Sequence, residues 1–443
     1  MRILLFFLLF ACAARSSAQS FGNGNIVVVR IGTGALPMTA GTAQPVYLDE
    51  YTPCGELVRS IAMPVTVSGS HRRLTLPPAS ADYTEGFISL SEDGQYLALG
   101  GYDAATGTAA VTGSTSSTVN RVVGIIDATA NVNTTTAFSN RFSTVSIRSA
   151  ITDGSNVWAA GGNGGIVYAT AGSTGTSNTL LTSTTGRCLG IYDGQLYATS
   201  TATNLRMTRV GSGLPTTAGQ TMTNLPGYAT TGGSPLQFFM ARLNGSDTVN
   251  VLYIADNNQL KKYSLVAGSW TANGTLGVTG DKYRGLTGTV SGSDVILYAL
   301  RRNDTGGEII QYTDNTGYNA SFANLKPIIL VQADSNRVFR DLSMAPQAVS
   351  PLAALKTSNS TTGFRVLSNR KGPLVLAEIA ASEPVRGMIN IYDQNGRIVY
   401  TRKVTVDKGI YRYPLDMPAN AHGLYFASFI SLRGDLITRK FIY

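Results

Sequence analysis

Between Ile26 and Pro346 the chain repeats one short unit: an apolar strand, a turn that contains glycine, and a second apolar strand. Residues 87–99 show the unit clearly, since Asp93-Gly94 joins two strands and is a strong hairpin signal. A single unit of this kind cannot bury both of its faces, so successive units must stack. The turn glycines lie 60, 40, 51 and 47 residues apart, at Gly94, Gly154, Gly194, Gly245 and Gly292.

This spacing is typical of a β-propeller, in which one four-stranded blade takes about 40–50 residues. Residues 337–343 resemble the first strand of a sixth unit whose other strands are missing. The chain begins with three strands that have no first strand before them, Ile26–Ile31, Val46–Tyr51 and Leu57–Ala62. Joining the two ends would complete one blade and remove edges that invite aggregation. We therefore predict an all-β fold, a β-propeller of six blades, while the 60-residue step leaves room for a seventh.

The first residues have the pattern of a signal peptide. Arg2 supplies a positive start, an apolar run follows at residues 3–11, and small residues lead to a cleavage site between Ala18 and Gln19. Neither this run nor any later one reaches the roughly 20 residues of a membrane-spanning helix. The predicted segments are a signal peptide at 1–18, the β-propeller at 19–346, a linker at 347–362 and a small Ig-like antiparallel β-sandwich at 363–443.

The charge distribution argues against one class of partner. The formal charge of +9 arises outside the propeller, because residues 19–346 hold 20 basic and 20 acidic residues. Nucleic-acid binding depends on Lys and Arg side chains that neutralise phosphates, so we expect no nucleic-acid partner. Cys54 lies in a turn and Cys188 in a strand of another repeat, and we expect both to remain unpaired thiols.

Histidine is nearly absent, which removes most catalytic arrangements. His71 is the one histidine of the propeller and lies in a loop, so neither a Ser-His-Asp triad nor a zinc site with several His or Cys ligands can be built. Residues 256–258 and 303–308 hold oxygen ligands without the spacing of a calcium loop, and ordinary turns explain them. We predict no catalytic residue, no metal and no cofactor.

One regularity marks a candidate binding site. Polar residues recur before the turn in each unit, where the first strand of a blade would line the central channel. A ring of Arg side chains there would hold an anionic ligand such as an acidic sugar, whereas the structural alternative pairs them with carboxylates between blades. The six residues of this predicted ring are Arg148, Arg187, Arg284, Arg340, Glu85 and Gln237.

The last 80 or so residues carry a family resemblance. They contain Ile389–Tyr400, Leu415–Pro418, His422–Ala427 and a basic-apolar finish at Arg439–Tyr443. This layout resembles the type A C-terminal sorting domain of the type IX secretion system of Bacteroidetes. Leu367–Arg370 stands where that family often has a Pro-Asn-Pro element. The motif residues that match are Gly423, Leu424, Tyr425 and Lys440.

The resemblance implies export through the Sec translocon and the type IX secretion machinery, and a secreted or cell-surface location after removal of the tail. The propeller region also resembles uncharacterised secreted β-propeller proteins, through the pieces Asp49–Pro53 and Asn120–Gly124. No activity follows from either resemblance.

Two hypotheses of function remain. The first is a monomeric, non-catalytic propeller that binds a glycan or a protein, which fits the scarce histidines and the Thr-, Ser- and Asn-rich loops. The second is a polysaccharide hydrolase or lyase that uses carboxylate or Tyr residues at the channel. The second needs acids clustered at the channel, and the sequence alone does not place them.

Overall fold

The computed structural model describes residues 20–78, 84–162, 164–181, 184–278, 280–301, 306–348, 362–368, 375–394, 397–417, 422–431 and 436–443. The chain forms two compact units, residues 1–348 and 349–443. Nearly all regular structure in the described ranges is β-strand, with one short 3₁₀ helix, η1, at Val111–Gly113. None of these ranges contains a helix with the length and apolar character needed to cross a bilayer.

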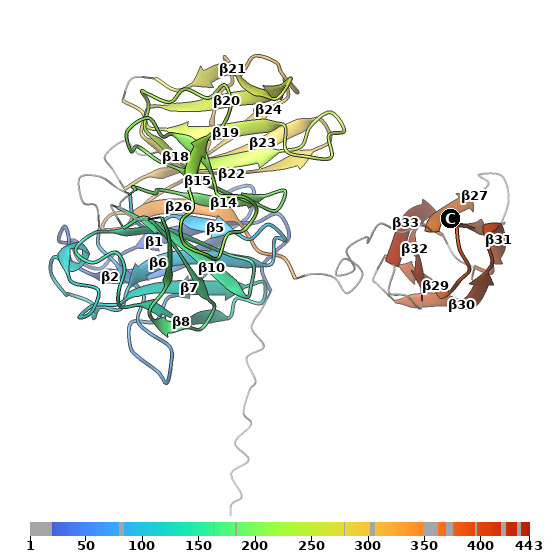
Figure 1. Cartoon of the computed structure of the whole chain (residues 1–443), viewed down its shortest axis with the longest axis horizontal. Coiled ribbons are helices and arrows are strands. Elements are labelled where there is room, and N and C mark those ends of the chain that lie inside the picture. The colour runs from blue at the N-terminus through green and yellow to red at the C-terminus, as the bar shows by residue number, and fades with distance from the viewer. Residues whose placement is uncertain are drawn as a thin grey trace, which may run out of the picture. The chain divides into compact units, whose positions relative to one another are not determined.

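The described part of the first unit forms six groups of four strands, in which neighbouring strands are antiparallel (Figure 1). The first group joins the two ends of the unit: β26 pairs with β1, β1 with β2, and β2 with β3. The strands of the first three groups are β26 (Val338–Met344), β1 (Ile26–Ile31), β2 (Gln44–Tyr51) and β3 (Leu57–Ala62); β5 (Ile88–Leu90), β6 (Tyr96–Tyr102), β7 (Arg121–Asp127) and β8 (Val132–Phe138); and β9 (Ile147–Thr152), β10 (Asn156–Gly161), β11 (Ile166–Thr170) and β13 (Asn178–Leu181).

The other three groups follow the order of the sequence. Two short strands outside the groups, β4 (Thr75–Leu76) and β12 (Thr174–Gly175), extend the first two groups into one ten-stranded sheet. The strands of the fourth, fifth and sixth groups are β14 (Leu189–Tyr192), β15 (Gln195–Thr199), β16 (Met207–Val210) and β17 (Met222–Asn224); β18 (Pro235–Ala241), β19 (Val251–Asp256), β20 (Gln259–Val266) and β21 (Ser269–Leu276); and β22 (Tyr283–Ser291), β23 (Asp294–Arg301), β24 (Glu308–Asp314) and β25 (Ile328–Gln332).

The predicted union of the two ends is confirmed by the strand register. Val27 lies opposite Ser343 and Ile31 opposite Val338 in the antiparallel pair of β1 and β26. The 60-residue interval between the turn glycines Gly94 and Gly154 contains no additional sheet among the described residues. Its extra length forms the connection between β6 and β7, residues 103–120, which includes η1.

The first strands of the six groups lie side by side around a common centre. β26, β5, β9 and β14 contact one another in that order, and β18, β22 and β26 do the same. Between β14 and β18 the rings of Tyr192 and Phe238 approach to 6.0 Å. Each sheet stays open, with an inner edge at the centre and an outer edge at the periphery. This arrangement makes the first unit an all-β fold of the β-propeller kind.

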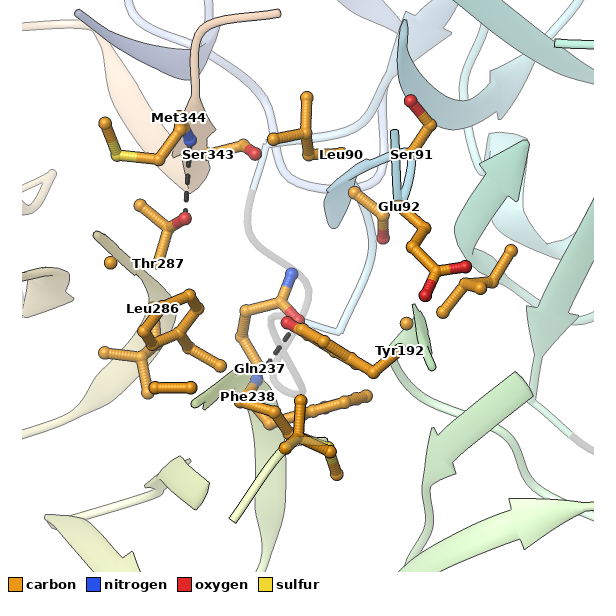
Figure 2. Close-up of a pocket in the computed structure, with 18 of the residues that line it drawn as sticks. Leu90, Ser91, Glu92, Tyr192, Gln237, Phe238, Leu286, Thr287, Ser343 and Met344 are labelled. Atoms are coloured by element: carbon orange, nitrogen blue, oxygen red, sulfur yellow. Dashed lines mark hydrogen bonds between the residues drawn. The ribbon is translucent and has the colours of Figure 1, made fainter. Parts of the chain in front are cut away.

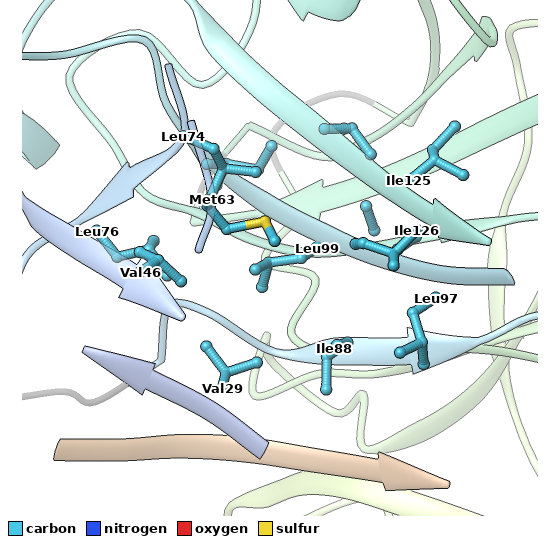
Figure 3. Packing of buried hydrophobic residues seen from close by; sticks show 14 of the residues in the cluster. Val29, Val46, Met63, Leu74, Leu76, Ile88, Leu97, Leu99, Ile125 and Ile126 are labelled. Carbon is cyan, nitrogen blue, oxygen red and sulfur yellow. The ribbon is translucent and has the colours of Figure 1, made fainter. Parts of the chain in front are cut away.

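Apolar side chains fill the spaces between neighbouring sheets. Figure 3 shows the cluster between the first two groups, where Val29, Leu76, Leu99 and others meet. Gly124 of β7 leaves room for this packing, because a Cβ atom there would lie 2.8 Å from Leu74 Cδ1 and the Leu74 side chain would have to shift. Trp158 is 1% exposed between the third and fourth groups, and its Nε1 donates to the carbonyl of Pro215 at 2.7 Å.

The second unit consists, in its described part, of seven strands in two antiparallel sheets. Its sheets share one core, in which the rings of Phe364 and Phe429 lie 6.1 Å apart. Gln347, predicted to open the linker, belongs to the first unit, where its backbone N–H donates to the carbonyl of Gly94 at 2.8 Å. The sheets are β27 (Thr362–Ser368), β28 (Val375–Ala381) and β31 (Gly409–Leu415), and then β30 (Ile398–Val406), β29 (Val385–Asp393), β32 (Leu424–Ser431) and β33 (Leu436–Ile442).

Candidate functional site

A cavity of about 410 Å³ lies where the inner strands of the first unit converge (Figure 2). Its wall comes from five of the six inner strands, β5, β14, β18, β22 and β26, and mainly from their carboxyl-terminal residues. The volume falls in the range of ordinary small-ligand pockets, about 300–1,000 Å³. We refer to it below as the central pocket.

Gln237 of β18 forms the polar floor of the central pocket. Its Nε2 donates to the carbonyl of Ile88 at 3.0 Å and to Asp341 Oδ2 at 2.8 Å, and its Oε1 accepts from the backbone N–H of Phe238. Asp341 Oδ2 also accepts from the backbone N–H of Ile88 at 2.9 Å. These bonds tie β5, β18 and β26 together at the centre. They use the hydrogen-bonding groups of Gln237, so its amide holds the floor in place.

Asp341 lies beneath this floor and is 0% exposed. Burial raises the pKa of its carboxyl well above the usual range, and the hydrogen bonds that it accepts offset this only in part. The raised pKa favours the uncharged form of this carboxyl. Because it is buried and does not line the pocket, it is not placed to contact a ligand.

The walls of the central pocket are mainly apolar, with hydroxyl groups at intervals. Figure 2 shows Leu90, Leu286 and Met344 around the opening, together with Thr287 and Ser343. Thr287 Oγ1 accepts from the backbone N–H of Met344 at 3.3 Å, which leaves its hydroxyl hydrogen for another partner.

Tyr192 contributes an aromatic wall. Burial raises the pKa of its hydroxyl to about 12, so the side chain stays neutral throughout the physiological range.

The rim of the central pocket carries a carboxylate that sequence reasoning did not single out. Glu92, in the turn after β5, is exposed and accepts from the backbone N–H of Gly194 at 3.0 Å. Nearby, Arg242 forms an ion pair with Asp193. Glu92 is the one acidic side chain among the residues described as lining the pocket.

The predicted polar ring lies at the opposite ends of the same inner strands. Arg148, Arg284, Arg340 and Gln237 lie in the first half of β9, β22, β26 and β18, while Glu85 and Arg187 lie just before β5 and β14. The six residues thus have comparable positions relative to their inner strands. Of the six, Gln237 alone lines the central pocket among the described residues, so that pocket and the predicted ring are different places.

The described contacts of the ring arginines include hydrogen bonds to neutral oxygens of neighbouring segments. Arg187 Nη1 donates to Ser234 Oγ at 2.7 Å, and Arg340 Nη2 donates to the carbonyl of Pro77 at 2.6 Å. Arg148 Nε donates to Ser146 Oγ at 3.2 Å. Glu85 turns to its own sheet, where Oε1 accepts from the Tyr102 hydroxyl. These bonds hold the ring residues to the sheets, and ligand binding by the ring remains a prediction.

The other sequence candidates have ordinary structural surroundings. His71 is half-buried, and its Nδ1 accepts from the backbone N–H of Thr134 at 3.4 Å. Asp256 pairs with Lys261 at 2.6 Å, and Glu308 pairs with Arg301. Residues 302–305 of the second oxygen-rich loop lie outside the described residues. Within the described ranges no three His, Cys, Asp or Glu side chains gather as a metal site.

The C-terminal motif residues lie on two paired strands, or in the case of Gly423 directly before one of them. Gly423 and Tyr443 exchange two backbone hydrogen bonds, of 2.9 and 3.0 Å, at the end of the pair formed by β32 and β33. Leu424 lies opposite Ile442, and Lys440 lies opposite Phe426. Two of the four pieces of sequence on which the resemblance rests, His422–Ala427 and Arg439–Tyr443, are therefore neighbours in space. Ala18 and Gln19 lie outside the described residues.

No protein-family model matches the chain, and no curated protein matches it. Solved structures do match. One is the β-propeller domain of Cps50 (Swd1) from Myceliophteria thermophila, with 11% identity, a TM-score of 0.31, and coverage of 81% of this chain and 96% of that chain. Another is a chain of the Mitotic Checkpoint Complex, with 11% identity, a TM-score of 0.32, and coverage of 73% and 96%. At these identities and TM-scores the likeness carries no argument about function.

The arrangement of sheets within the chain places it in the β-propeller class. The central pocket, where five inner strands end, is its candidate functional site.

Proposed function

We propose that this protein is an exported six-bladed β-propeller that binds a ligand in the central pocket without chemical turnover. The observation that supports binding is the pocket itself. It lies where five inner strands end, its walls are mainly apolar, and hydroxyl groups and one carboxylate stand at intervals around it. Concave sites of this composition, at the convergence of several elements, are the usual places for ligands.

The alternative, a polysaccharide hydrolase or lyase, has less support. Glycoside hydrolysis commonly needs two carboxyl groups on opposite sides of the scissile bond. Glu92 is one acid at the pocket, and Asp341 is 0% exposed beneath the floor. Tyr192 has a raised pKa, about 12, which does not favour its use as a base. The residues described at the pocket therefore lack a second accessible acid.

The binding function is tested with a variant that fills the pocket. Val290 lines it and is 39% exposed, so Val290→Trp should occupy the cavity without disturbing the core. Glycan and peptide arrays probed with the full chain should give binding that Val290→Trp abolishes. Val278→Trp is the matched control, since Val278 is 69% exposed and does not line the pocket. Equal binding by wild type and Val290→Trp would refute the site, and release of reducing sugar by purified protein would favour the enzyme.

We further propose that the C-terminal domain is an Ig-like sorting domain of the type IX kind, and that it directs the protein to the cell surface or medium. The support is the motif set Gly423, Leu424, Tyr425 and Lys440, which the fold brings onto two paired strands. Deletion of residues 363–443 should trap the protein in the periplasm. Appearance of the truncated chain at the surface would overturn the proposal.

A further inference from the structure

The floor of the central pocket is uncharged, and its hydrogen-bond donors are in use. Gln237 Nε2 donates one hydrogen to the carbonyl of Ile88 and the other to Asp341 Oδ2, while its Oε1 accepts from the backbone N–H of Phe238. A side chain that enters from the solvent places its tip against this floor. A charged tip would lose its hydration there without meeting an opposite charge at the pocket surface, which is costly. The floor therefore favours an uncharged tip.

Buried apolar side chains surround the floor. Each of the five inner strands that line the pocket contributes at least one of them. An apolar group that packs against such side chains is stabilised in proportion to the apolar area that leaves water. One residue from each strand, none of them more than 4% exposed, defines what we call the apolar collar: Ile88, Leu189, Phe238, Leu286 and Leu342.

The hydroxyl groups of the pocket differ in what they leave for a ligand. Ser89 and Ser91 donate to oxygens of the protein itself, a carbonyl at 3.0 Å and a carboxylate at 2.6 Å. Thr287 accepts from a backbone N–H and keeps its hydrogen, on the wall where Figure 2 also shows Ser343. This arrangement suits a ligand with one polar side, such as a peptide backbone, better than a sugar ring with hydroxyls all round.

The mouth of the pocket carries both signs of charge. Among the described lining residues Glu92 is the acid and Arg242 the base, and Arg242 also pairs with Asp193. A ligand with a net charge of either sign gains little from such a mouth. Tyr192 and Met344 also line the pocket, and aromatic residues, methionine and arginine are enriched at protein–protein interfaces. An apolar centre inside a polar rim is likewise the layout of those interfaces.

We propose that the central pocket receives a bulky apolar side chain, such as Leu, Met or Phe, from a protein partner, an inference that rests on the binding function proposed above. The tip of this side chain packs against the apolar collar and the neutral floor. Thr287 donates a hydrogen bond to the backbone of the partner, whose surface covers the rim. A free fatty acid would use the same walls, but its carboxylate would meet Glu92 and Asp193 as well as Arg242.

The test uses the full chain and capped heptapeptides that are identical except at the central residue, which is Leu, Phe, Ala, Lys or Glu in a Ser-Ala background. Affinities come from ligand-observed NMR, and decanoate and a neutral glycan array are probed in parallel. We expect the Leu and Phe peptides to bind, and the Ala peptide to bind at least about tenfold more weakly because it buries less apolar area. The Lys and Glu peptides should bind no better than the Ala peptide.

Salt provides a second readout on the same peptides. The affinity of the Leu peptide should change less than about twofold between about 50 and 500 mM salt, because an apolar contact is not screened. A steep fall in affinity with salt would refute an apolar contact.

Substitutions at one exposed position assign the binding to the pocket. Val290→Trp should abolish binding of the Leu peptide. Val290→Thr replaces a methyl group by a hydroxyl at nearly constant shape and should weaken that binding about threefold. Val58→Thr is the matched control, since Val58 on β3 is 45% exposed, against 39% for Val290, and does not line the pocket. Circular dichroism of each variant checks the fold.

The outcomes separate this inference from the binding function. Glycan binding that Val290→Trp abolishes, with no preference for Leu or Phe peptides, would refute the apolar side chain and leave the pocket as a site. Decanoate that binds more tightly than the Leu peptide, and is lost in Val290→Trp, would refute the protein partner. Lys and Leu peptides of equal affinity would also refute the inference. If no probe shows binding that depends on Val290, both proposals fail.

Discussion

Lys262 of β20 and Asp314 of β24 form an ion pair between two neighbouring sheets of the propeller, and both side chains are 0% exposed. The Nζ atom lies 2.7 Å from Oδ2. Asp314 also accepts from the Tyr253 hydroxyl at 2.6 Å and from the Thr316 hydroxyl and backbone N–H at 2.6 and 3.0 Å. Lys262 has two further acceptors, Thr316 Oγ1 at 2.9 Å and the carbonyl of Gly317 at 2.7 Å.

These contacts predict unequal costs for removing the two partners. Asp314→Ala leaves a buried ammonium and three other hydrogen-bond donors without their acceptor. It should therefore lower the free energy of unfolding by about 4–5 kcal/mol, the upper end for a broken buried pair. Lys262→Met leaves a carboxylate that still accepts three hydrogen bonds, so its cost should be smaller, about 2–3 kcal/mol. The double variant Lys262→Met with Asp314→Asn has neither charge of this pair. Its free energy of unfolding should therefore fall by less than that of either single variant.

The assay is urea unfolding followed by tryptophan fluorescence. Both tryptophans, Trp158 and Trp270, lie in the first unit, so the signal reports that unit alone. Asp334→Ala is the control, because its pair with Arg337 is exposed and should contribute less than about 0.5 kcal/mol. A cost for Asp314→Ala below about 1 kcal/mol, or a double variant worse than both singles, would refute the reasoning.

The same pair predicts a pH dependence. Burial alone would raise the pKa of Asp314, but hydrogen bonds from Lys262, Thr316 and Tyr253 outweigh it and the pKa is lowered. A carboxyl whose folded-state pKa is lowered stabilises the fold above its unfolded pKa, near 3.9, and this stability is lost as pH falls through the folded value. The difference in free energy of unfolding between wild type and Asp314→Asn should reach its full value at pH 6 and should shrink below about pH 4.

Three further predictions follow from single sites. Gly423 has φ +112°, so Gly423→Val should destabilise the second unit by about 1–3 kcal/mol, while Gly363→Ala, which has ordinary contacts, should cost much less; thermal unfolding of the two variants compares them. Cys54 is exposed and Cys188 is buried, with its pKa raised by burial, so a thiol reagent should label Cys54 in the native protein and Cys188 only after unfolding. Trp158→Phe removes a buried hydrogen bond and part of a core ring, and should cost about 2 kcal/mol in urea unfolding.

The repeat pattern determined much of the fold. Hairpin turns such as Asp93-Gly94 fix strand pairing locally, so the two inner strands of each sheet could be read from the sequence. The orphan strand at residues 337–343 and the three initial strands predicted their own union, which the register of β1 and β26 confirms. Arg148, Arg284 and Arg340 lie in the first half of inner strands and Arg187 just before one, at the places that the same alignment indicates.

The site did not follow from these patterns. Periodicity places a residue on a strand, but it does not say at which end of the strands a cavity remains, since that depends on how side chains from several sheets fill the centre. The predicted ring residues are tied to their sheets by hydrogen bonds, and the cavity lies at the other end. The alignment used for the ring, applied to the residues beside each turn, would have marked Glu92.

By itself, the sequence determined the strands, their order and the pairing of the chain ends, because these depend on local turn chemistry and on the alternation of apolar residues. Tertiary structure alone decided which side chains converge. Glu92 reaches the backbone of Gly194, 102 residues away, and Asp341 meets Gln237 across 104 residues. Such contacts arise from the packing of distant sheets around one centre, and no local pattern in the chain encodes them.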